Sequence, residues 1–244
     1  MGHRCSSKPR MAIFLLVPGA WLGGWCWRDV AAHLEADGHK PVGATLTGLG
    51  ERAHLLSQHI GLHTHISDIV GMVNHRDLNE VVLVGHSYGG MVITGAAEQI
   101  PAHIRCLVYL DASVPRDGES SNDVIGPEMA SRLRDSANLA GEGWKVPPTS
   151  LDGWELSDTI RPWVEQRLTP HPLGTFEEPI RLRSKAAAAL PRAFIRSSTK
   201  SALYARLMER ERHAGWRGCD LKGGHYPMFT EPRLVASALT RVLE

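Results

Sequence analysis

Hydrophobic residues in this chain occur in short runs rich in β-branched side chains, and these runs alternate with stretches whose apolar positions have helical spacing. Such alternation is typical of crossover units around a mostly parallel sheet flanked by helices, so we predict an α/β fold. We expect strands at residues 12–17, 41–46, 80–84, 105–110, 193–197 and 217–221. We expect helices at residues 25–37, 61–75, 88–99, 201–212 and 232–243.

Residues 113–185 interrupt this alternation of expected strands and helices. They contain eight prolines, three tryptophans and only short helical fragments, such as residues 127–138. A structureless loop of that size is improbable in a compact domain, so the segment should carry short elements of its own. We therefore expect a single α/β domain over residues 1–244, with a helical cap inserted at about 113–185, after the strand that ends at Leu110.

Composition narrows the class of partner. Lys and Arg number 27 against 26 Asp and Glu, which gives no reason to expect nucleic acid or an anionic membrane. No apolar stretch approaches the roughly 18 residues that span a bilayer. The four cysteines lie far apart, which indicates reduced thiols, and we expect a cytoplasmic protein. The basic start followed by apolar residues 11–17 imitates a signal peptide, but that run ends at Pro18, and residues 1–10 are expected to be a loose tail.

A candidate nucleophile lies at the end of the third expected strand. Gly85-His86-Ser87-Tyr88-Gly89 follows the apolar run at residues 81–84 and precedes a helix rich in small residues. This is the context of a G-x-S-x-G nucleophile elbow, in which a strained turn exposes the serine hydroxyl. Glycines at 85 and 89 would leave room for that turn, and Gly90 and Gly95 would let the helix pack closely. The alternative is an ordinary glycine-rich turn.

A serine hydroxyl needs a base to remove its proton, and a histidine late in the chain is the expected one. His225 follows the last expected strand within the segment 222–227, whose two glycines could turn its side chain back toward the elbow. Enzymes with a G-x-S-x-G nucleophile elbow also carry the serine before the histidine along the chain, as Ser87 precedes His225 here. The alternative is a histidine on a surface loop.

The third member of a triad should be a carboxylate that holds the imidazole in the correct tautomer. Its usual place is after the penultimate strand, but residues 197–200 contain no acid. Asp111 follows the apolar run 106–110 at the end of the neighbouring strand, and we predict that it is the acid. The other candidates are Asp117, Asp123 and Asp220.

Acyl transfer also needs two N–H donors for the developing oxyanion. The backbone of Tyr88, next to the nucleophile, supplies one. Gly19, after the first strand, permits a turn that would direct the Ala20 N–H inward. A Pro-Gly turn without this role would have the same geometry.

Weaker patterns concern the pocket and metals. As pocket residues we predict the following set, with packing of the cap as the alternative for its last three tryptophans: Gly19, Trp21, Met228, Trp144, Trp154 and Trp163. Four histidines cluster at residues 54–65, but no set of ligands is complete, so we predict no metal.

Three segments carry a family resemblance: residues 17–27 (VPGAWLGGWCW), 46–52 (LTGLGER) and 84–91 (VGHSYGGM). They resemble the plant and bacterial family of small α/β-hydrolases that contains hydroxynitrile lyases, plant hormone methyl esterases and bacterial esterases. The similarity spans most of the chain except the cap. It implies a Ser-His-acid triad, no cofactor and a cap enclosing an apolar pocket.

The chain departs from that family at three places. Pro18 stands where a histidine is more usual, and the acid after the strand at 193–197 is missing, although residues 109–112 are similar to the acid-bearing segment of haloalkane dehalogenases. The lyases use a lysine beside the catalytic histidine and a threonine in the first loop, whereas the matching positions here are Tyr226 and Gly19. Cyanohydrin cleavage is therefore disfavoured.

We expect a carboxylic-ester hydrolase that acts through an acyl-enzyme on a small, largely apolar ester, without cofactor. Two alternatives stay open: a lyase or cyclase that uses the same triad for proton transfer in natural-product metabolism, and a non-catalytic binding protein with the hydrolase fold. The sequence leaves the physiological substrate undecided and a homodimer open.

Overall fold

The computed structural model describes residues 11–198 and 201–243, so the predicted tail at residues 1–10 lies outside the described part of the chain. Its centre is a six-stranded sheet in which every pair of neighbours is parallel. The strand order is β2-β1-β3-β4-β7-β8. The bounds are β1 Ile13–Val17, β2 Lys40–Gly43, β3 Val81–His86, β4 Ile104–Leu110, β7 Arg192–Ser198 and β8 Arg217–Gly223.

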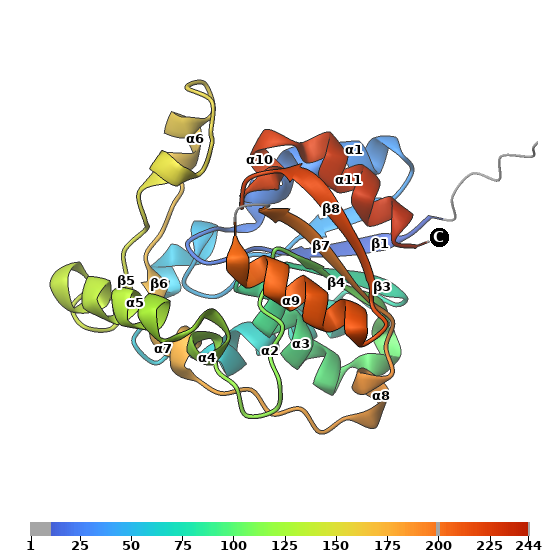
Figure 1. The fold of residues 1–244 in the computed structure, drawn as a ribbon, viewed down its shortest axis with the longest axis horizontal. Helices are drawn as coiled ribbons and strands as arrows, with labels where there is room; N and C mark the ends of the chain where they lie inside the picture. Colours follow the sequence, from blue (N-terminus) through green and yellow to red (C-terminus); the bar gives the residue numbers. More distant parts are fainter. Residues whose placement is uncertain (1–10, 199–200, 244) are drawn as a thin grey trace, which may run out of the picture.

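Helices cover both faces of this sheet (Figure 1). One face carries α1 Arg28–Ala36, α10 Pro227–Thr230 and α11 Pro232–Arg241. The other carries α2 Leu62–His75, α3 Gly89–Gln99 and α9 Ala202–His213. Short 3-10 turns occupy Gly24–Trp27, Gly50–Leu55 and Pro101–His103. The predicted α/β fold is thereby confirmed.

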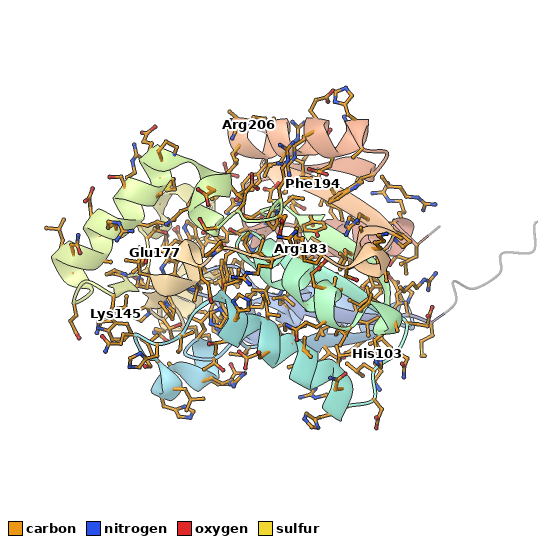
Figure 2. All side chains as sticks on the ribbon, turned by 90° about the horizontal axis from the view of Figure 1, so that it is seen from below. His103, Lys145, Glu177, Arg183, Phe194 and Arg206 are labelled. Atoms are coloured by element: carbon orange, nitrogen blue, oxygen red, sulfur yellow. The ribbon has the colours of Figure 1, made fainter. Side chains whose placement is uncertain are left out.

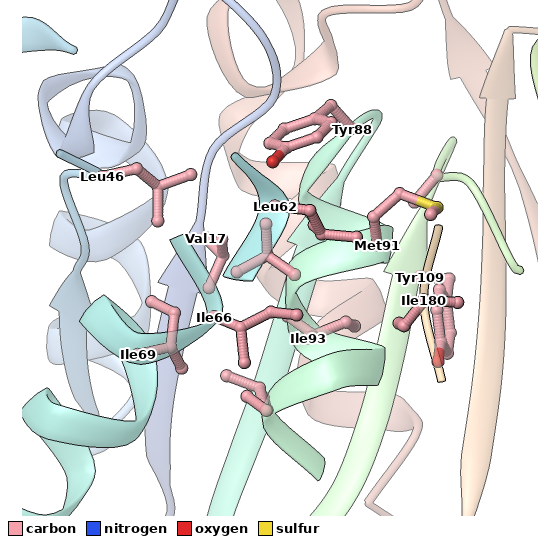
Figure 3. Close-up of a cluster of buried hydrophobic side chains, with 14 of the residues drawn as sticks. Val17, Leu46, Leu62, Ile66, Ile69, Tyr88, Met91, Ile93, Tyr109 and Ile180 are labelled. Carbon is pink, nitrogen blue, oxygen red and sulfur yellow. The ribbon is translucent and has the colours of Figure 1, made fainter. Parts of the chain in front are cut away.

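The two cores follow from the alternation of side chains along each strand. In β3, Val81 and Leu83 point to the core beneath α2 and α3, whereas Val82 and Val84 point to the core beneath α1 and α11. Figure 3 shows part of the first core, where Ile66 of α2 lies among side chains from the sheet and α3. Because both faces are covered, every residue of β3 is buried, which explains its continuous apolar run.

The segment between β4 and β7 holds short elements, some of which lie outside the layered body (Figure 1). They are α4 Ser121–Ile125, α5 Pro127–Ala140, β5 Lys145–Val146, a 3-10 turn at Leu151–Gly153, α6 Arg161–Glu165, β6 His171–Pro172, α7 Gly174–Glu177 and α8 Lys185–Ala188. Strands β5 and β6 pair antiparallel as a separate ribbon. In Figure 2, Lys145 of this ribbon lies at the periphery, whereas Phe194 of β7 lies inside.

Two further findings concern the described residues. No helix among them is both long and apolar enough to cross a membrane. Cys26, Cys106 and Cys219 are free thiols; Cys5 lies outside the described part.

Candidate active site

Ser87 stands where β3 ends and α3 begins, with a backbone φ of +53°. That left-handed conformation is costly for a non-glycine residue, and its neighbours hold it in place. The Ser87 N–H donates to the Leu110 carbonyl, and the Ser87 carbonyl accepts from the N–H groups of Gly90 and Ser113. A side chain at Gly85 would begin 2.6 Å from the Gly89 carbonyl oxygen, so the turn requires glycine there.

His225 reaches Ser87 from the loop that follows β8. The distance between His225 Nε2 and Ser87 Oγ is 3.1 Å. A second contact fixes this loop on the elbow: His86 Nε2 lies 2.7 Å from the His225 carbonyl oxygen, to which it can donate. Burial, and then the proximity of His225, lower the pKa of His86 well below its ordinary range, so His86 is neutral at physiological pH.

Asp111 lies on the opposite side of the imidazole from Ser87. Its Oδ2 is 3.5 Å from His225 Nδ1, its side chain is fully buried, and its Oδ1 accepts the Ser197 N–H at 2.8 Å. Register explains the placement: His86 and Leu110 are partners in neighbouring strands, so the residues that follow them leave the sheet at the same level. Asp111 also has a positive φ, +42°, a conformation that Asp tolerates better than most residues.

The other candidate acids have different partners. Asp117 accepts from the Leu182 N–H, Asp123 forms a capping box with Ser120 at the start of α4, and Asp220 pairs with Arg196. The structure therefore brings Ser87, His225 and Asp111 together and places these three carboxylates elsewhere.

Tyr204 joins this group, and sequence reasoning missed it. Its ring stacks on the imidazole of His225, with centroids 5.0 Å apart and planes inclined by 12°. Its hydroxyl lies 3.4 Å from His225 Nε2. The residue belongs to the first turn of α9, where the Ser201 side chain caps the helix by accepting the Tyr204 N–H. No motif surrounds Tyr204, so only its position three residues into a helix that follows β7 could have suggested it.

The predicted oxyanion residues flank the nucleophile. Ala20 and Tyr88 line the same cavity as Ser87. The loop after β1 passes very close to the elbow: a side chain at Gly19 would begin 2.9 Å from Ser87 Cβ. The side chain of Tyr88 turns away from His225: its hydroxyl is 3.0 Å from Nδ1 of the buried His65.

A cavity of about 540 Å³ opens over Ser87 and His225. Its apolar lining comes from the loop after β1, from the segment between β4 and β7, and from α9: Trp21, Ile125, Met129, Leu133, Phe176 and Leu203. Its polar lining includes Ser113, Ser121, Thr149, Ser201, Glu128 and Arg132.

Only Trp21 of the six predicted pocket residues is among the lining residues. Gly19 lies close to His86 and Ser87 Cβ, and Met228 of α10 is fully buried in the core. Trp144 lies against Lys145, Trp154 stacks on Tyr226 at 3.5 Å, and Trp163 packs on Trp25. None of these three tryptophans is among the residues that line the cavity, and the contacts of Trp154 and Trp163 are those of the alternative, packing of the inserted segment.

The histidines at residues 54–65 do not gather into one metal site. His65 is buried between the Tyr88 hydroxyl and the Thr47 carbonyl, while the more exposed His63 pairs with Glu178 at 2.7 Å. Within residues 11–198 and 201–243, no three metal-ligating side chains gather into a metal site.

Comparison with known sequences decides the family. The family described as "Alpha/beta hydrolase family" matches residues 14–238. This chain belongs to the alpha/beta hydrolase family. A carbendazim hydrolyzing esterase from Nocardioides sp. (strain SG-4G) is 38% identical to this hydrolase over 94% of the chain and 98% of the relative. A putative chloroplastic methylesterase 14 from Arabidopsis thaliana is 28% identical over 95% of the chain and 72% of the relative.

Solved structures agree with this hydrolase in fold. An extracellular alpha/beta-hydrolase from a Paenibacillus species, described as sharing structural and functional homology with tobacco salicylic acid binding protein 2, superimposes with a TM-score of 0.84 at 22% identity, covering 95% of this chain and 98% of that one. Tomato methylketone synthase I gives a TM-score of 0.77 at 20% identity, covering 96% and 98%. The expected resemblance to small esterases is confirmed, and the named esterases among the relatives support an esterase enzyme.

Proposed function

We propose that this hydrolase cleaves carboxylic esters through a Ser87-His225-Asp111 triad and an acyl-enzyme intermediate. The observation that carries the proposal is the 3.1 Å contact between Ser87 Oγ and His225 Nε2, with the Asp111 carboxylate behind Nδ1. These are the distances at which an imidazole can take a hydroxyl proton while a carboxylate stabilises the resulting imidazolium.

Acylation proceeds as follows. Ser87 Oγ attacks the ester carbonyl carbon as His225 Nε2 takes its proton, and the carbonyl electron pair moves to oxygen. The backbone N–H groups of Ala20 and Tyr88 donate to that oxyanion. The electron pair on the oxyanion then re-forms the carbonyl, and the bond from the acyl carbon to the alcohol oxygen breaks. The leaving oxygen receives the proton from His225 Nε2. Water, activated by the same imidazole, releases the acid in a second attack.

Residues 113–185 act as the cap in this proposal, since α4 and α5 supply part of the cavity wall above Ser87. The volume of about 540 Å³ and the mixed lining suit a small, largely apolar ester. Carbendazim, named in the 38%-identical relative, is the first compound to test as a substrate.

The experiment that tests the proposal compares wild-type protein with the Ser87→Ala variant on p-nitrophenyl acetate, p-nitrophenyl butyrate and carbendazim. We expect turnover by the wild type and a loss of about 10⁴-fold or more in kcat for Ser87→Ala, because the nucleophile is removed. A fluorophosphonate should add covalently to wild type and leave Ser87→Ala unmodified. Binding of these esters without turnover would instead support a non-catalytic binding protein.

A further inference from the structure

Two hydroxyl groups converge on the nitrogen that shuttles the proton. His225 Nε2 lies 3.1 Å from Ser87 Oγ and 3.4 Å from Tyr204 Oη. The triad accounts for the first contact. The second comes from a helix that carries no other part of the proposed machinery, and Tyr204 lines the cavity in which the ester would bind.

Toward an anionic oxygen, the Tyr204 hydroxyl can act only as a hydrogen-bond donor. Burial raises the pKa of the phenol above its ordinary value, and the Asp111 carboxylate raises it further, whereas a hydrogen bond with Ser87 lowers it. The phenol therefore keeps its proton throughout the working range of a serine hydrolase.

Geometry defines what the hydroxyl would meet during the reaction. The alcohol oxygen that leaves must come within hydrogen-bonding reach of Nε2 to collect its proton. The Tyr204 hydroxyl is fixed 3.4 Å from that nitrogen by the stacking of its ring on the imidazole and by the first turn of α9. An oxygen that approaches Nε2 from the cavity thus approaches the Tyr204 hydroxyl as well.

We propose that Tyr204 Oη donates a hydrogen bond to the leaving-group oxygen while the acyl–oxygen bond breaks, which fits the enzyme to esters of unactivated alcohols. This inference rests on the proposed function. The electron pair of the breaking bond goes to the leaving oxygen, the proton comes from His225 Nε2, and Tyr204 keeps its own proton. The phenol stabilises charge on an alkoxide that accumulates before proton transfer is complete.

The test is the dependence of the rate on the leaving group. Methyl butyrate and p-nitrophenyl butyrate give the same acyl-enzyme, but p-nitrophenolate is stable without a donor and methoxide is not. We expect Tyr204→Phe to lower kcat/KM for methyl butyrate by about 10- to 100-fold, the range of one charge-assisted hydrogen bond. For p-nitrophenyl butyrate we expect Tyr204→Phe to lower kcat/KM by less than about threefold.

The ratio of the two kcat/KM values, measured on one sample, is independent of the fraction of folded enzyme, so poor folding of the variant does not obscure the result. Tyr204→Leu, which also removes the stacked ring, should lower both rates further without restoring the ratio. The matched control is Tyr109→Phe: this buried hydroxyl bonds Thr94 at 2.8 Å and lies outside the cavity over Ser87, so the ratio should stay that of wild type.

An equal loss for both esters in Tyr204→Phe would overturn the proposal, because a residue that only orients the imidazole slows both alike. An unchanged rate for both would overturn it too. If wild type shows no Ser87-dependent turnover of either ester, the proposed function fails instead, and the two failures are distinguishable.

Discussion

The proposed triad takes its acid, Asp111, from the end of β4 rather than from the penultimate strand. The acid of a triad must face Nδ1 of the histidine, and at the carboxyl edge of a parallel sheet more than one strand end lies within reach of that nitrogen. Here β7 contributes a backbone N–H from Ser197 to Asp111 Oδ1. The penultimate strand thus orients a carboxylate carried by its neighbour.

Replacing Asp111 by Asn tests this role. Asn can still accept the Ser197 N–H through its oxygen, but its amide would face Nδ1 as a donor and favour the tautomer with the proton on Nε2, which cannot take the Ser87 proton. We expect kcat for p-nitrophenyl butyrate to fall about 10²- to 10⁴-fold. Circular dichroism should show that the variant keeps its fold.

The control for that variant is Asp220→Asn, which removes a carboxylate that pairs with the Arg196 guanidinium beyond the site. Its kcat should stay within about threefold of wild type. Equal rates for Asp111→Asn and wild type would show that another carboxylate serves His225.

Sequence patterns predict candidate residues next to recognisable strand ends, whereas a residue that reaches the site only through the packing of a distant helix leaves no such signal. The sequence predicts Ser87 because strand, glycines and helix occur together within a few residues. Tyr204 reaches His225 only because α9 begins beside the end of β7, a relation that depends on the packing of α9 against the sheet. The sequence leaves Trp154 open between the pocket and packing for the same reason, since its stacking on Tyr226 joins the inserted segment to the loop after β8.

At the scale of elements, strands buried on both faces were the easiest to predict. The expected strand at 105–110 and the observed β4, Ile104–Leu110, differ by one residue at one end, because burial on both sides favours the apolar run at Cys106–Leu110. β2 ends earlier than expected: residues 44–46 are buried, but β2 stops at Gly43. The predicted helix at 25–37 divides into a 3-10 turn and α1. Burial alone does not determine where an element stops.

The junction between α3 and the loop after β4 offers a prediction at this scale. A side chain at Gly90 would begin 2.1 Å from the Ser113 carbonyl oxygen, which is backbone, whereas one at Gly95 would meet the Ile66 side chain. We expect Gly90→Ala to destabilise the protein by about 3 kcal/mol or more, since backbone must move. Gly95→Ala should cost less, because Ile66 can shift and alanine favours the helix by about 1 kcal/mol over glycine.

Urea unfolding of both variants, monitored by circular dichroism, measures the difference. Gly90→Ala should also reduce esterase activity more than Gly95→Ala among folded molecules, because the Ser113 loop is continuous with Asp111. A Gly90→Ala protein as stable as Gly95→Ala would contradict the close approach of these two backbones.

Across the whole molecule, buried histidines hold the loops around the site together. His171 of β6 faces two ways: its Nδ1 accepts the Trp21 N–H from the loop after β1, and its Nε2 contacts the Thr175 hydroxyl at 2.8 Å. His65 of α2 lies next to it, with ring centroids 5.8 Å apart. These contacts tie the inserted segment to the body close to the cavity, and the acceptor role of His171 Nδ1 requires that ring to be neutral.

That requirement makes stability depend on pH. Burial, as the largest cause, lowers the pKa of His65 to about 4, and burial followed by the proximity of His65 lowers that of His171 well below its ordinary value. Unfolded histidines titrate near 6.5, so below that pH the unfolded chain binds protons that the folded chain refuses. The contribution of these neutral rings to the free energy of unfolding should therefore be fully present above about pH 6.5. It should fall as the pH drops toward 4, by up to about 1.4 kcal/mol per pH unit for each such ring.

Urea unfolding at a series of pH values between 7.5 and 4.5 measures this slope in wild type and in His65→Gln. The glutamine amide can still contact the Tyr88 hydroxyl and the Thr47 carbonyl, but it does not titrate, so the slope of its unfolding free energy against pH below about 6.5 should be shallower by up to about 1.4 kcal/mol per pH unit. The exposed His54, changed to Gln, serves as the control and should leave the wild-type slope unaltered. Identical slopes for wild type and His65→Gln would mean that acid reaches this ring without unfolding the chain, and the buried histidines would then be a local contact rather than a source of pH-dependent stability.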